Sequence, residues 1–226
     1  MEIKSTSLES GTESKERRFV MVIDLARCKN ARRCVEACQQ AHHLPSHQEL
    51  MKVYLMQESE EATPYWMPKP CFHCDHPLCV ESCPEGATTK RHDGIVVIDR
   101  EKCLNCKLCM TVCPYSSRLS GKTDPTAAKN ETAGRSQEFG KNGNSSVSKC
   151  DFCAELVSDG GTPHCVAACA SGAIYFGDKN LDTVSNGFET VSFSELIGKR
   201  GGFRHLEELG TLPNVYYLPP SGLPIL

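Results

Sequence analysis

Closely spaced cysteines constrain this chain more than any other feature. There are 15 of them among 226 residues, and they fall into four runs. The third run, Cys103 to Cys113, has the spacing C-x2-C-x2-C-x3-C followed by proline, and the second, Cys71 to Cys83, differs only in its longer middle gap. Three sulfurs on so short a loop can reach three corners of one inorganic cluster, while the fourth, on the next helical turn, points toward a neighbouring cluster. The spacing therefore predicts iron–sulfur binding.

Other uses of cysteine fit this pattern poorly. The number of cysteines is odd, and most of them lie two or three residues apart, which is too close for a framework of independent disulfides. Structural zinc sites use pairs of cysteines, whereas each of these two runs has four sulfurs with a closely spaced third. Aromatic residues make up only 7% of the chain, so the hydrophobic core is modest and metal ligation is expected to supply much of the folding energy.

The second and third runs are expected to build two [4Fe-4S] clusters as one unit, as in bacterial ferredoxins, by exchanging their last cysteines. The exchange follows from the direction of the fourth sulfur in each run. One cluster would then be held by Cys71, Cys74, Cys79 and Cys113. The other would be held by Cys83, Cys103, Cys106 and Cys109.

The first run, Cys28 to Cys38, lacks one ligand. When the same spacing is laid on it, Ala31 occupies the second position, and a methyl group cannot bind iron. Two outcomes remain open: the corner is vacant and the cluster is [3Fe-4S], or another ligand such as His42 or His43 fills it. The three-iron cluster is favoured because both histidines lie beyond the helix that carries the end of the run.

The fourth run joins the first through a predicted strand pairing. Residues 19–25 and 172–177 both have the composition of buried strands, and their pairing would place the two runs side by side. The same exchange then gives one [4Fe-4S] cluster held by Cys38, Cys150, Cys153 and Cys165, and a [3Fe-4S] site held by Cys28, Cys34 and Cys169. Every cysteine is thus assigned as an iron ligand, so none is left for a disulfide or a nucleophile.

These patterns predict an α+β fold of two pseudo-symmetric bacterial-ferredoxin-like modules, with short β-hairpins, cluster-binding loops, long loops and an extended C-terminal tail. Runs 1 and 4 form one module, and runs 2 and 3 form the other. We expect a disordered or extended tail at 1–17, the four-cluster region at 18–177 with a polar surface insertion at 121–148, and a C-terminal extension at 178–226 that docks on partner subunits.

Local signals add four elements. Residues 52–57 predict a strand, and the proline-rich segment 63–70 predicts an extended connector. Asp93-Gly94 predicts the turn of a hairpin. Residues 194–209 predict a helix with a break at Gly201.

Charge and hydropathy exclude other classes. The formal net charge is −3, and the basic residues are scattered without aromatic interleaving, so no nucleic-acid partner is expected. The hydrophilic start, residues 1–17, lacks the apolar region of a secretory signal. No stretch approaches the roughly 18 consecutive apolar residues of a membrane helix.

Besides the spacing of the cysteines, several short motifs resemble those of a known protein family. They are M-V-I-D before the first run, C-P-Y at the end of the third, K-C-D-F-C at the fourth and P-N-V-Y-Y-L-P near the C-terminus. With four runs in this order, residues 18–177 resemble the four-cluster iron–sulfur subunits of the dimethyl sulfoxide reductase superfamily, which includes polysulfide and tetrathionate reductases, formate dehydrogenases and quinone reductase complexes. Ala31 is a departure, because relatives usually have cysteine there, although some members carry a three-iron centre.

The resemblance implies a function. The chain would be a non-catalytic electron-transfer subunit of a membrane-associated respiratory oxidoreductase complex, between a molybdopterin-type or related large subunit and an integral-membrane quinone-site subunit, with a cytochrome as a further partner. It would lie peripherally on a membrane, with the periplasmic side, reached by co-export with a partner, favoured over the cytoplasmic side.

The residues offer no catalytic group of their own: we find no general base, nucleophile or phosphate cradle, so the expected chemistry is one-electron transfer. Two other interpretations remain open. The chain could be a free-standing polyferredoxin that shuttles electrons by diffusion, although its apolar, proline-rich tail disfavours this. It could instead be an enzyme that uses the vacant iron corner as a Lewis acid, which the lack of a nearby acid–base pair disfavours.

Overall fold

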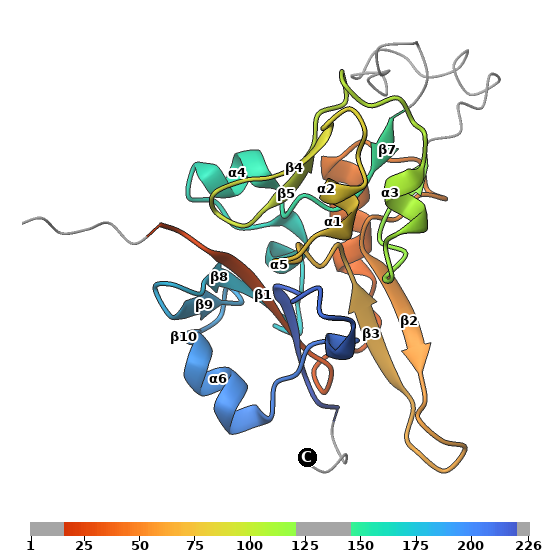
Figure 1. Ribbon diagram of the computed structural model, residues 1–226. Coiled ribbons are helices and arrows are strands. Elements are labelled where there is room, and N and C mark those ends of the chain that lie inside the picture. The colour runs from red at the N-terminus through yellow and green to blue at the C-terminus, as the bar shows by residue number, and fades with distance from the viewer. Residues whose placement is uncertain (1–15, 121–145, 221–226) are drawn as a thin grey trace, which may run out of the picture.

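The computed structural model describes residues 16–120 and 146–220. Most of the expected N-terminal tail and most of the expected insertion therefore lie outside the described residues. The described chain is a mixed α+β structure, in which one five-stranded sheet and three two-stranded ladders alternate with short helices. In Figure 1 the sheet lies beside the loops and short helices that carry the cysteines.

β1 (Phe19–Asp24) is an interior strand of the five-stranded sheet and is buried along its whole length. The sheet order is β10 (Thr190–Ser192), β9 (Thr183–Ser185), β8 (Ile174–Asp178), β1 and β11 (Val215–Leu218). β8 pairs antiparallel with β1, as the sequence predicts for 172–177 and 19–25. This pairing ties the segment before the first cysteine run to the segment after the fourth.

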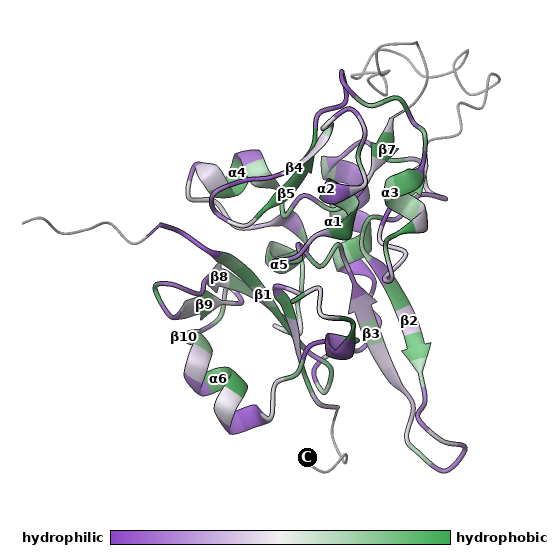
Figure 2. Ribbon diagram, in the orientation of Figure 1, coloured by the Kyte–Doolittle hydropathy of each residue, from purple (hydrophilic) through white to green (hydrophobic). Residues whose placement is uncertain are grey.

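The two faces of β1 pack against different partners because strand side chains alternate in direction. Met21 and Ile23 belong to the larger hydrophobic cluster, which also contains four of the five buried cysteines. Val20 and Val22 belong to a second cluster with Phe193 at the start of α6 (Phe193–Arg200). The sheet is therefore covered on one face by the cysteine loops and on the other by a helix, and Figure 2 shows β1 in the hydrophobic colour.

The C-terminal segment differs from its expected role. Val215–Leu218, from the P-N-V-Y-Y-L-P motif, is strand β11 and pairs in parallel with β1. All four of its residues are buried, and the Tyr217 hydroxyl donates a hydrogen bond of 2.9 Å to the Pro68 carbonyl. For this segment the prediction of docking on a partner is wrong, because its apolar side chains complete the chain's own sheet.

Three short ladders project from the cysteine region. The predicted hairpin at Asp93-Gly94 is formed by β4 (Thr88–Lys90) and β5 (Val96–Ile98). The predicted strand at 52–57 is β2 (Lys52–Met56), but its partner is β3 (Tyr65–Lys69), which the sequence had predicted as a connector. β6 (Leu119–Ser120) pairs with β7 (Val147–Ser148), so the end of the expected 121–148 insertion is held in a ladder.

The remaining helices are short. α1 (Arg33–Ala41), α2 (Leu78–Glu81), α3 (Leu108–Thr111) and α5 (His164–Ala167) follow or carry the cysteine runs, and α4 (Ala154–Ser158) follows the Cys153 loop. α1 packs against α5, and α2 packs against α3. The helix predicted for 194–209 is split: α6 ends at Arg200, where Gly201 has a positive φ, and only a 3-10 turn follows at Glu207–Leu209.

One carboxylate links three parts of the fold. Asp75, beside the second cysteine run, accepts hydrogen bonds from Arg18 at 2.7 Å, from Lys90 at 2.8 Å and from Asn214 at 2.9 Å. These residues lie before β1, at the end of β4 and before β11. Burial alone would raise the pKa of Asp75, but the bonds from Lys90 and Asn214 and the charge of Arg18 bring its pKa below the ordinary value. The second run is thereby anchored to the sheet.

Candidate iron–sulfur sites

The four cysteine loops share one backbone feature. In each run the residue just before the second ligand position has a positive φ: 53° at Asn30, 44° at His73, 53° at Asn105 and 56° at Phe152. Side chains other than glycine rarely adopt this left-handed conformation, so its recurrence marks a common turn. The loop at Ala31 thus has the same turn as the loops that present Cys74, Cys106 and Cys153, although it offers only a methyl group.

All fifteen cysteines are free thiols, and four of them belong to the main hydrophobic cluster. A thiol that is buried next to other thiols, without a disulfide, suits a soft metal centre, because iron–sulfur clusters are held by thiolates. The chemistry of the donor set therefore fits iron–sulfur clusters. Each thiol changes the pKa of the thiols beside it, and these changes indicate which thiols lie close together.

Cys28, Cys34 and Cys169 lie together. Burial raises the pKa of Cys34 to about 11, and the next causes are the neighbouring thiols of Cys169 and Cys28. The backbone amide of Ala173 donates a hydrogen bond of 3.3 Å to the Cys169 sulfur. The structure brings these three sequence-predicted ligands to one place, with the exposed Ala31 between the first two in sequence.

A second group combines Cys38 with the fourth run. Burial, followed by the thiol of Cys153, raises the pKa of Cys38 to about 12. Burial also raises the pKa of Cys150 and of Cys165 well above the ordinary value, and Cys38 contributes in both cases. The structure brings together all four thiols that the sequence assigns to this site.

A third group lies around Cys74. Burial raises its pKa to about 12, with contributions from the thiols of Cys71, Cys79 and Cys113. Cys71, Cys74 and Cys79 come from the second run and Cys113 comes from the third. The expected exchange of the last cysteine is thus matched by the position of Cys113.

The fourth group lines a small cavity. Cys83, Cys103, Cys106 and Cys109 all contribute to its wall, so the last cysteine of the second run lies with the first three of the third. Burial would raise the pKa of Cys83, but the backbone amides of Thr88, Ala87 and Glu85 lower it below the ordinary value. These amides favour the thiolate, which is the form that binds metal.

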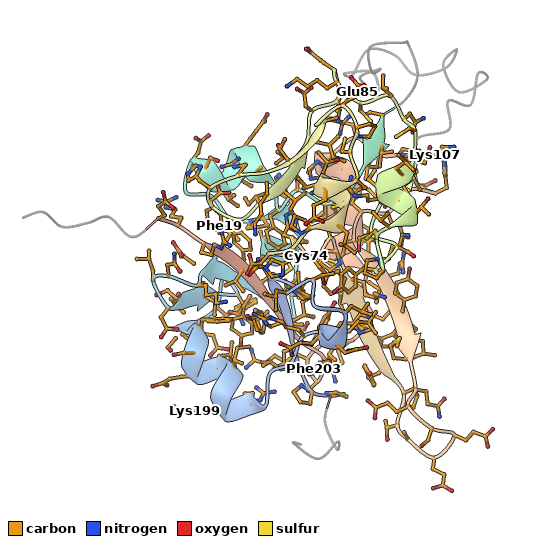
Figure 3. All side chains as sticks on the ribbon, viewed as in Figure 1. Phe19, Cys74, Glu85, Lys107, Lys199 and Phe203 are labelled. Atoms are coloured by element: carbon orange, nitrogen blue, oxygen red, sulfur yellow. The ribbon has the colours of Figure 1, made fainter. Side chains whose placement is uncertain are left out.

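The four groups follow one another in a row. Cys38 and Cys165 of the second group are close enough to the thiol of Cys34 for it to raise their pKa, and Cys150 is affected in the same way by Cys71 of the third group. The third and fourth groups come from the two interleaved runs and share α2 and α3. Figure 3 shows Cys74 inside the molecule, whereas Glu85 and Lys107, from the loops of the fourth group, lie toward one end.

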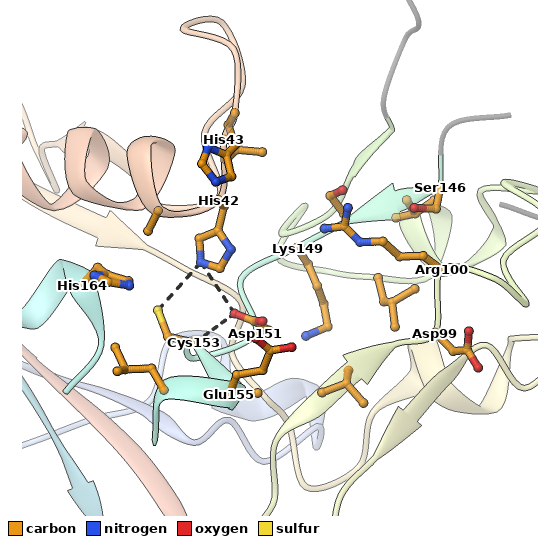
Figure 4. Close-up of a pocket in the computed structure, with 18 of the residues that line it drawn as sticks. His42, His43, Asp99, Arg100, Ser146, Lys149, Asp151, Cys153, Glu155 and His164 are labelled. Atoms are coloured by element: carbon orange, nitrogen blue, oxygen red, sulfur yellow. Dashed lines mark hydrogen bonds and ion pairs between the residues drawn. The ribbon is translucent and has the colours of Figure 1, made fainter. Parts of the chain in front are cut away.

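His42 is not at the first run's missing corner. Its Nε2 lies 3.8 Å from the sulfur of Cys153 and 3.8 Å from a carboxylate oxygen of Asp151 (Figure 4). It lines a cavity of about 740 Å³ together with His43. Within the described ranges, no hydrogen bond joins either histidine to Cys28, Cys34 or Cys169. The alternative in which a histidine completes the first site therefore gains no support from the geometry.

Two buried cations beside the sites were missed from the sequence. Arg118 is 4% exposed and Lys149 is 6% exposed. Arg118 follows the third run in C-P-Y-S-S-R, and Lys149 directly precedes Cys150. A basic residue next to a cysteine run was the available signal, but sequence alone does not show which of the chain's 25 Lys and Arg residues are buried.

Free thiols in four groups on a mixed α+β frame define an iron–sulfur protein of the dicluster ferredoxin type. The family model described as "4Fe-4S dicluster domain" matches residues 62–142 and 136–179. A selenate reductase subunit of Mesobacillus selenatarsenatis is 36% identical, over 90% of this chain and 72% of the relative. A tetrathionate reductase subunit of Salmonella typhimurium is 32% identical, over 91% and 74%. The menaquinone reductase iron-sulfur cluster-binding subunit of Nitratidesulfovibrio vulgaris is 31% identical, over 88% and 87%.

The chain belongs to the family of dicluster ferredoxin-like subunits found in dimethyl sulfoxide, selenate and tetrathionate reductases. The resemblance predicted from the motifs is thereby confirmed. With its family, the chain is an iron–sulfur electron-transfer subunit and not a catalytic one. Among the described residues, no helix combines the length and the apolar character needed to cross a bilayer.

Proposed function

We propose that this chain holds three [4Fe-4S] clusters and one [3Fe-4S] cluster and relays single electrons along them within a reductase complex. The four ligand sets are Cys28, Cys34 and Cys169 for three irons, then Cys38, Cys150, Cys153 and Cys165, then Cys71, Cys74, Cys79 and Cys113, and finally Cys83, Cys103, Cys106 and Cys109. The observation that carries the proposal is the grouping of the fifteen thiols into three sets of four and one set of three, each set adjacent to the next.

The pseudo-symmetric modules are part of this proposal. Runs 1 and 4 form one module and runs 2 and 3 form the other. The proposal is supported by the packing of α1 on α5 and of α2 on α3, and by the left-handed residue that recurs at the same place in each run.

The three-iron assignment rests on Ala31. Its loop has the backbone turn of a ligand loop, yet the side chain offers no donor atom, and the nearby histidines lie elsewhere or lack a contact with the site. A corner without a thiolate is the simplest reason for a cluster to keep three irons.

The chain's own residues prepare each site for electron transfer. Bound clusters would supply reversible one-electron chemistry, with potentials that depend on charge, hydrogen bonds to sulfur and burial. The thiolates bind iron, and the surrounding apolar side chains exclude water from the buried groups. Backbone amides near Cys83 and Cys169 favour the charged sulfur. No residue has to donate or accept a proton for an electron to pass.

We propose that the partners are a molybdopterin-type or related large subunit and an integral-membrane quinone-site subunit, with a cytochrome as a further partner. The support is the naming of relatives as subunits of selenate and tetrathionate reductases and of a menaquinone reductase. A peripheral position on the membrane follows from such partners, and the periplasmic side is favoured through co-export with one of them. The parts of 178–226 outside β11 remain a candidate surface for docking.

Isolation of the native complex tests this function. A tag on the chain, expressed at its natural level, should recover a larger assembly in mild detergent that contains a molybdopterin-binding chain and a membrane chain, identified by mass spectrometry. Iron should amount to about fifteen atoms per chain, and the oxidised protein should show a three-iron electron paramagnetic resonance (EPR) signal. A protein that elutes alone with all its clusters would instead indicate a diffusing polyferredoxin.

A further inference from the structure

Arg118 lies inside the protein between two groups of cysteines. Its side chain follows the third run, just before β6, and is 4% exposed. One guanidinium nitrogen, Nη1, donates a hydrogen bond of 3.3 Å to the hydroxyl of Thr88. The other, Nη2, is buried and has no hydrogen-bond partner among the described residues.

The charge of Arg118 lacks a carboxylate partner in the described part of the chain. The buried Asp93 is paired with Arg91 at 2.6 Å, and Asp75 is paired with Arg18 and Lys90. An arginine remains protonated at all ordinary pH values. A buried charge without a counter-charge costs several kcal/mol, so the fold requires an anion beside this guanidinium.

Arg118 lies beside both groups of thiols. Thr88, which accepts its hydrogen bond, lines the small cavity together with the four thiols of the fourth group. On the other side, the hydroxyl of the neighbouring Ser117 donates a hydrogen bond of 3.1 Å to the carbonyl of Pro70, the residue directly before Cys71 of the third group.

Burial alone would lower the pKa of Arg118, but the thiolates of Cys79, Cys109 and Cys71 raise it above the ordinary value. In return, the guanidinium offsets part of the rise that burial causes in the pKa of Cys79 and of Cys109, and the pKa of both thiols stays above the ordinary value. Cys79 and Cys71 belong to the third group of thiols, whereas Cys109 belongs to the fourth.

Lys149, the other buried cation beside these thiols, differs from Arg118 in its hydrogen-bond partners. It is also buried and also lowers the pKa of Cys79, but its ammonium group donates to the backbone carbonyls of Val96 and Cys150. The hydrogen-bond partners of this ammonium group are thus backbone oxygens, whereas one guanidinium nitrogen of Arg118 has no partner among the described residues.

We propose that Arg118 is a shared tuning residue that raises the reduction potentials of two neighbouring clusters together. These are the cluster held by Cys71, Cys74, Cys79 and Cys113 and the cluster held by Cys83, Cys103, Cys106 and Cys109. The inference rests on the proposed function, because it requires that both sets bind clusters. Arg118 is not itself a ligand, but it acts on the transfer of an electron between these two clusters.

The physical reason is the sign and place of the charge. Reduction adds one electron to a cluster, and a fixed positive charge nearby stabilises the more negative state, more strongly in a buried site than in water. When an electron passes between the two clusters, one is oxidised as the other is reduced, and Arg118 keeps its proton throughout. Because the guanidinium lies between them, it raises both potentials and keeps them close together.

The test compares two substitutions that remove the same charge. Arg118→Gln removes the buried cation, and Arg100→Gln removes an exposed cation from the same module. Potentiometric titration followed by EPR gives the potential of each cluster in the whole complex, and the signals that change in Cys79→Ser and Cys109→Ser identify the two clusters concerned. We expect both potentials to fall in Arg118→Gln, while the other two stay unchanged and all four stay unchanged in Arg100→Gln.

Unchanged potentials in Arg118→Gln, a fall in only one of the two, or an equal fall in Arg100→Gln would overturn the proposal. If Arg118→Gln fails to assemble its clusters, Arg118→Met decides, since it also removes the charge and its flexible apolar side chain leaves no polar amide without a partner in the buried site. Both potentials should then fall together, and two unchanged potentials would contradict the inference. An unsubstituted protein that lacks these two clusters would overturn the proposed function as well, whereas four intact clusters without a shift would overturn only the role of Arg118.

Discussion

At the scale of single residues, backbone conformation carries information that side-chain identity does not. Ala31 has no donor atom, and a sequence comparison within the chain shows only that a ligand is missing. The positive φ of Asn30, shared with His73, Asn105 and Phe152, shows that the loop still turns as the other three loops do. The first site is therefore one side chain short of the others and not a different kind of loop.

Restoring that side chain should restore the fourth iron. In Ala31→Cys we expect the three-iron EPR signal of the oxidised protein to disappear and a further reduced-state [4Fe-4S] signal to appear, since a thiolate would then occupy the missing position. Iron should rise from about fifteen to about sixteen atoms per chain. Ala31→Gly is the matched control and should keep the three-iron signal. The same signal in both variants would contradict the assignment of Ala31 to the vacant corner.

At the scale of elements, close packing between strands decides features that local propensity cannot. Residues 65–69 contain a proline and lie in a segment of three prolines, which predicts a connector, yet they pair with β2 as β3. Residues 215–218 lie between prolines and read as a tail, yet they form β11 beside β1. In both cases the partner strand is distant or its register is unknown from the sequence, so the pairing was not predictable.

Two glycines should respond to alanine in opposite directions. A Cβ at Gly177 in β8 would collide with the backbone of Thr183 and Val184 in β9, whereas a Cβ at Gly198 in α6 would meet nothing within 4 Å. We expect Gly177→Ala to destabilise the protein by about 1–3 kcal/mol. Gly198→Ala should stabilise it by about 0.5–1 kcal/mol, because alanine loses less backbone freedom in a helix.

Anaerobic denaturant unfolding of the cluster-loaded protein measures both changes. Circular dichroism should show a lower midpoint for Gly177→Ala and a higher midpoint for Gly198→Ala. Equal midpoints for Gly177→Ala and the parent protein would show that β8 and β9 are not as closely packed as described.

At the scale of the whole molecule, the cysteines are part of the core. The main hydrophobic cluster joins Met21 and Ile23 of the sheet to buried cysteines of three runs. Asp75 ties the second run to β1 through Arg18. The sheet and the four groups of thiols are thus one packed unit, in which the sites depend on the sheet and the sheet depends on the sites.

Removal of iron should therefore unfold much of the protein. After anaerobic treatment with an oxidant and a chelator, we expect the cooperative thermal transition to be lost and the fifteen thiols to react rapidly with a thiol reagent. The reason is that metal-free thiols leave the core without the bonds that hold its loops together. Protein treated with chelator alone is the control and should keep its transition. A metal-free protein with unchanged thermal stability would contradict this dependence.

The sequence by itself determined the chemistry of the protein: the spacing of the runs predicted iron–sulfur binding, the interleaved ligand sets and the gap at Ala31, because ligand spacing on a short loop is a local property. It also predicted the pairing of β1 with β8 and the family. Tertiary structure alone decided where distant groups meet. In the folded protein β11 pairs with β1, His42 lies beside Cys153, and Arg118 is buried between two groups of sulfurs. None of these could be predicted, because burial and long-range pairing depend on the packing of segments far apart in the chain.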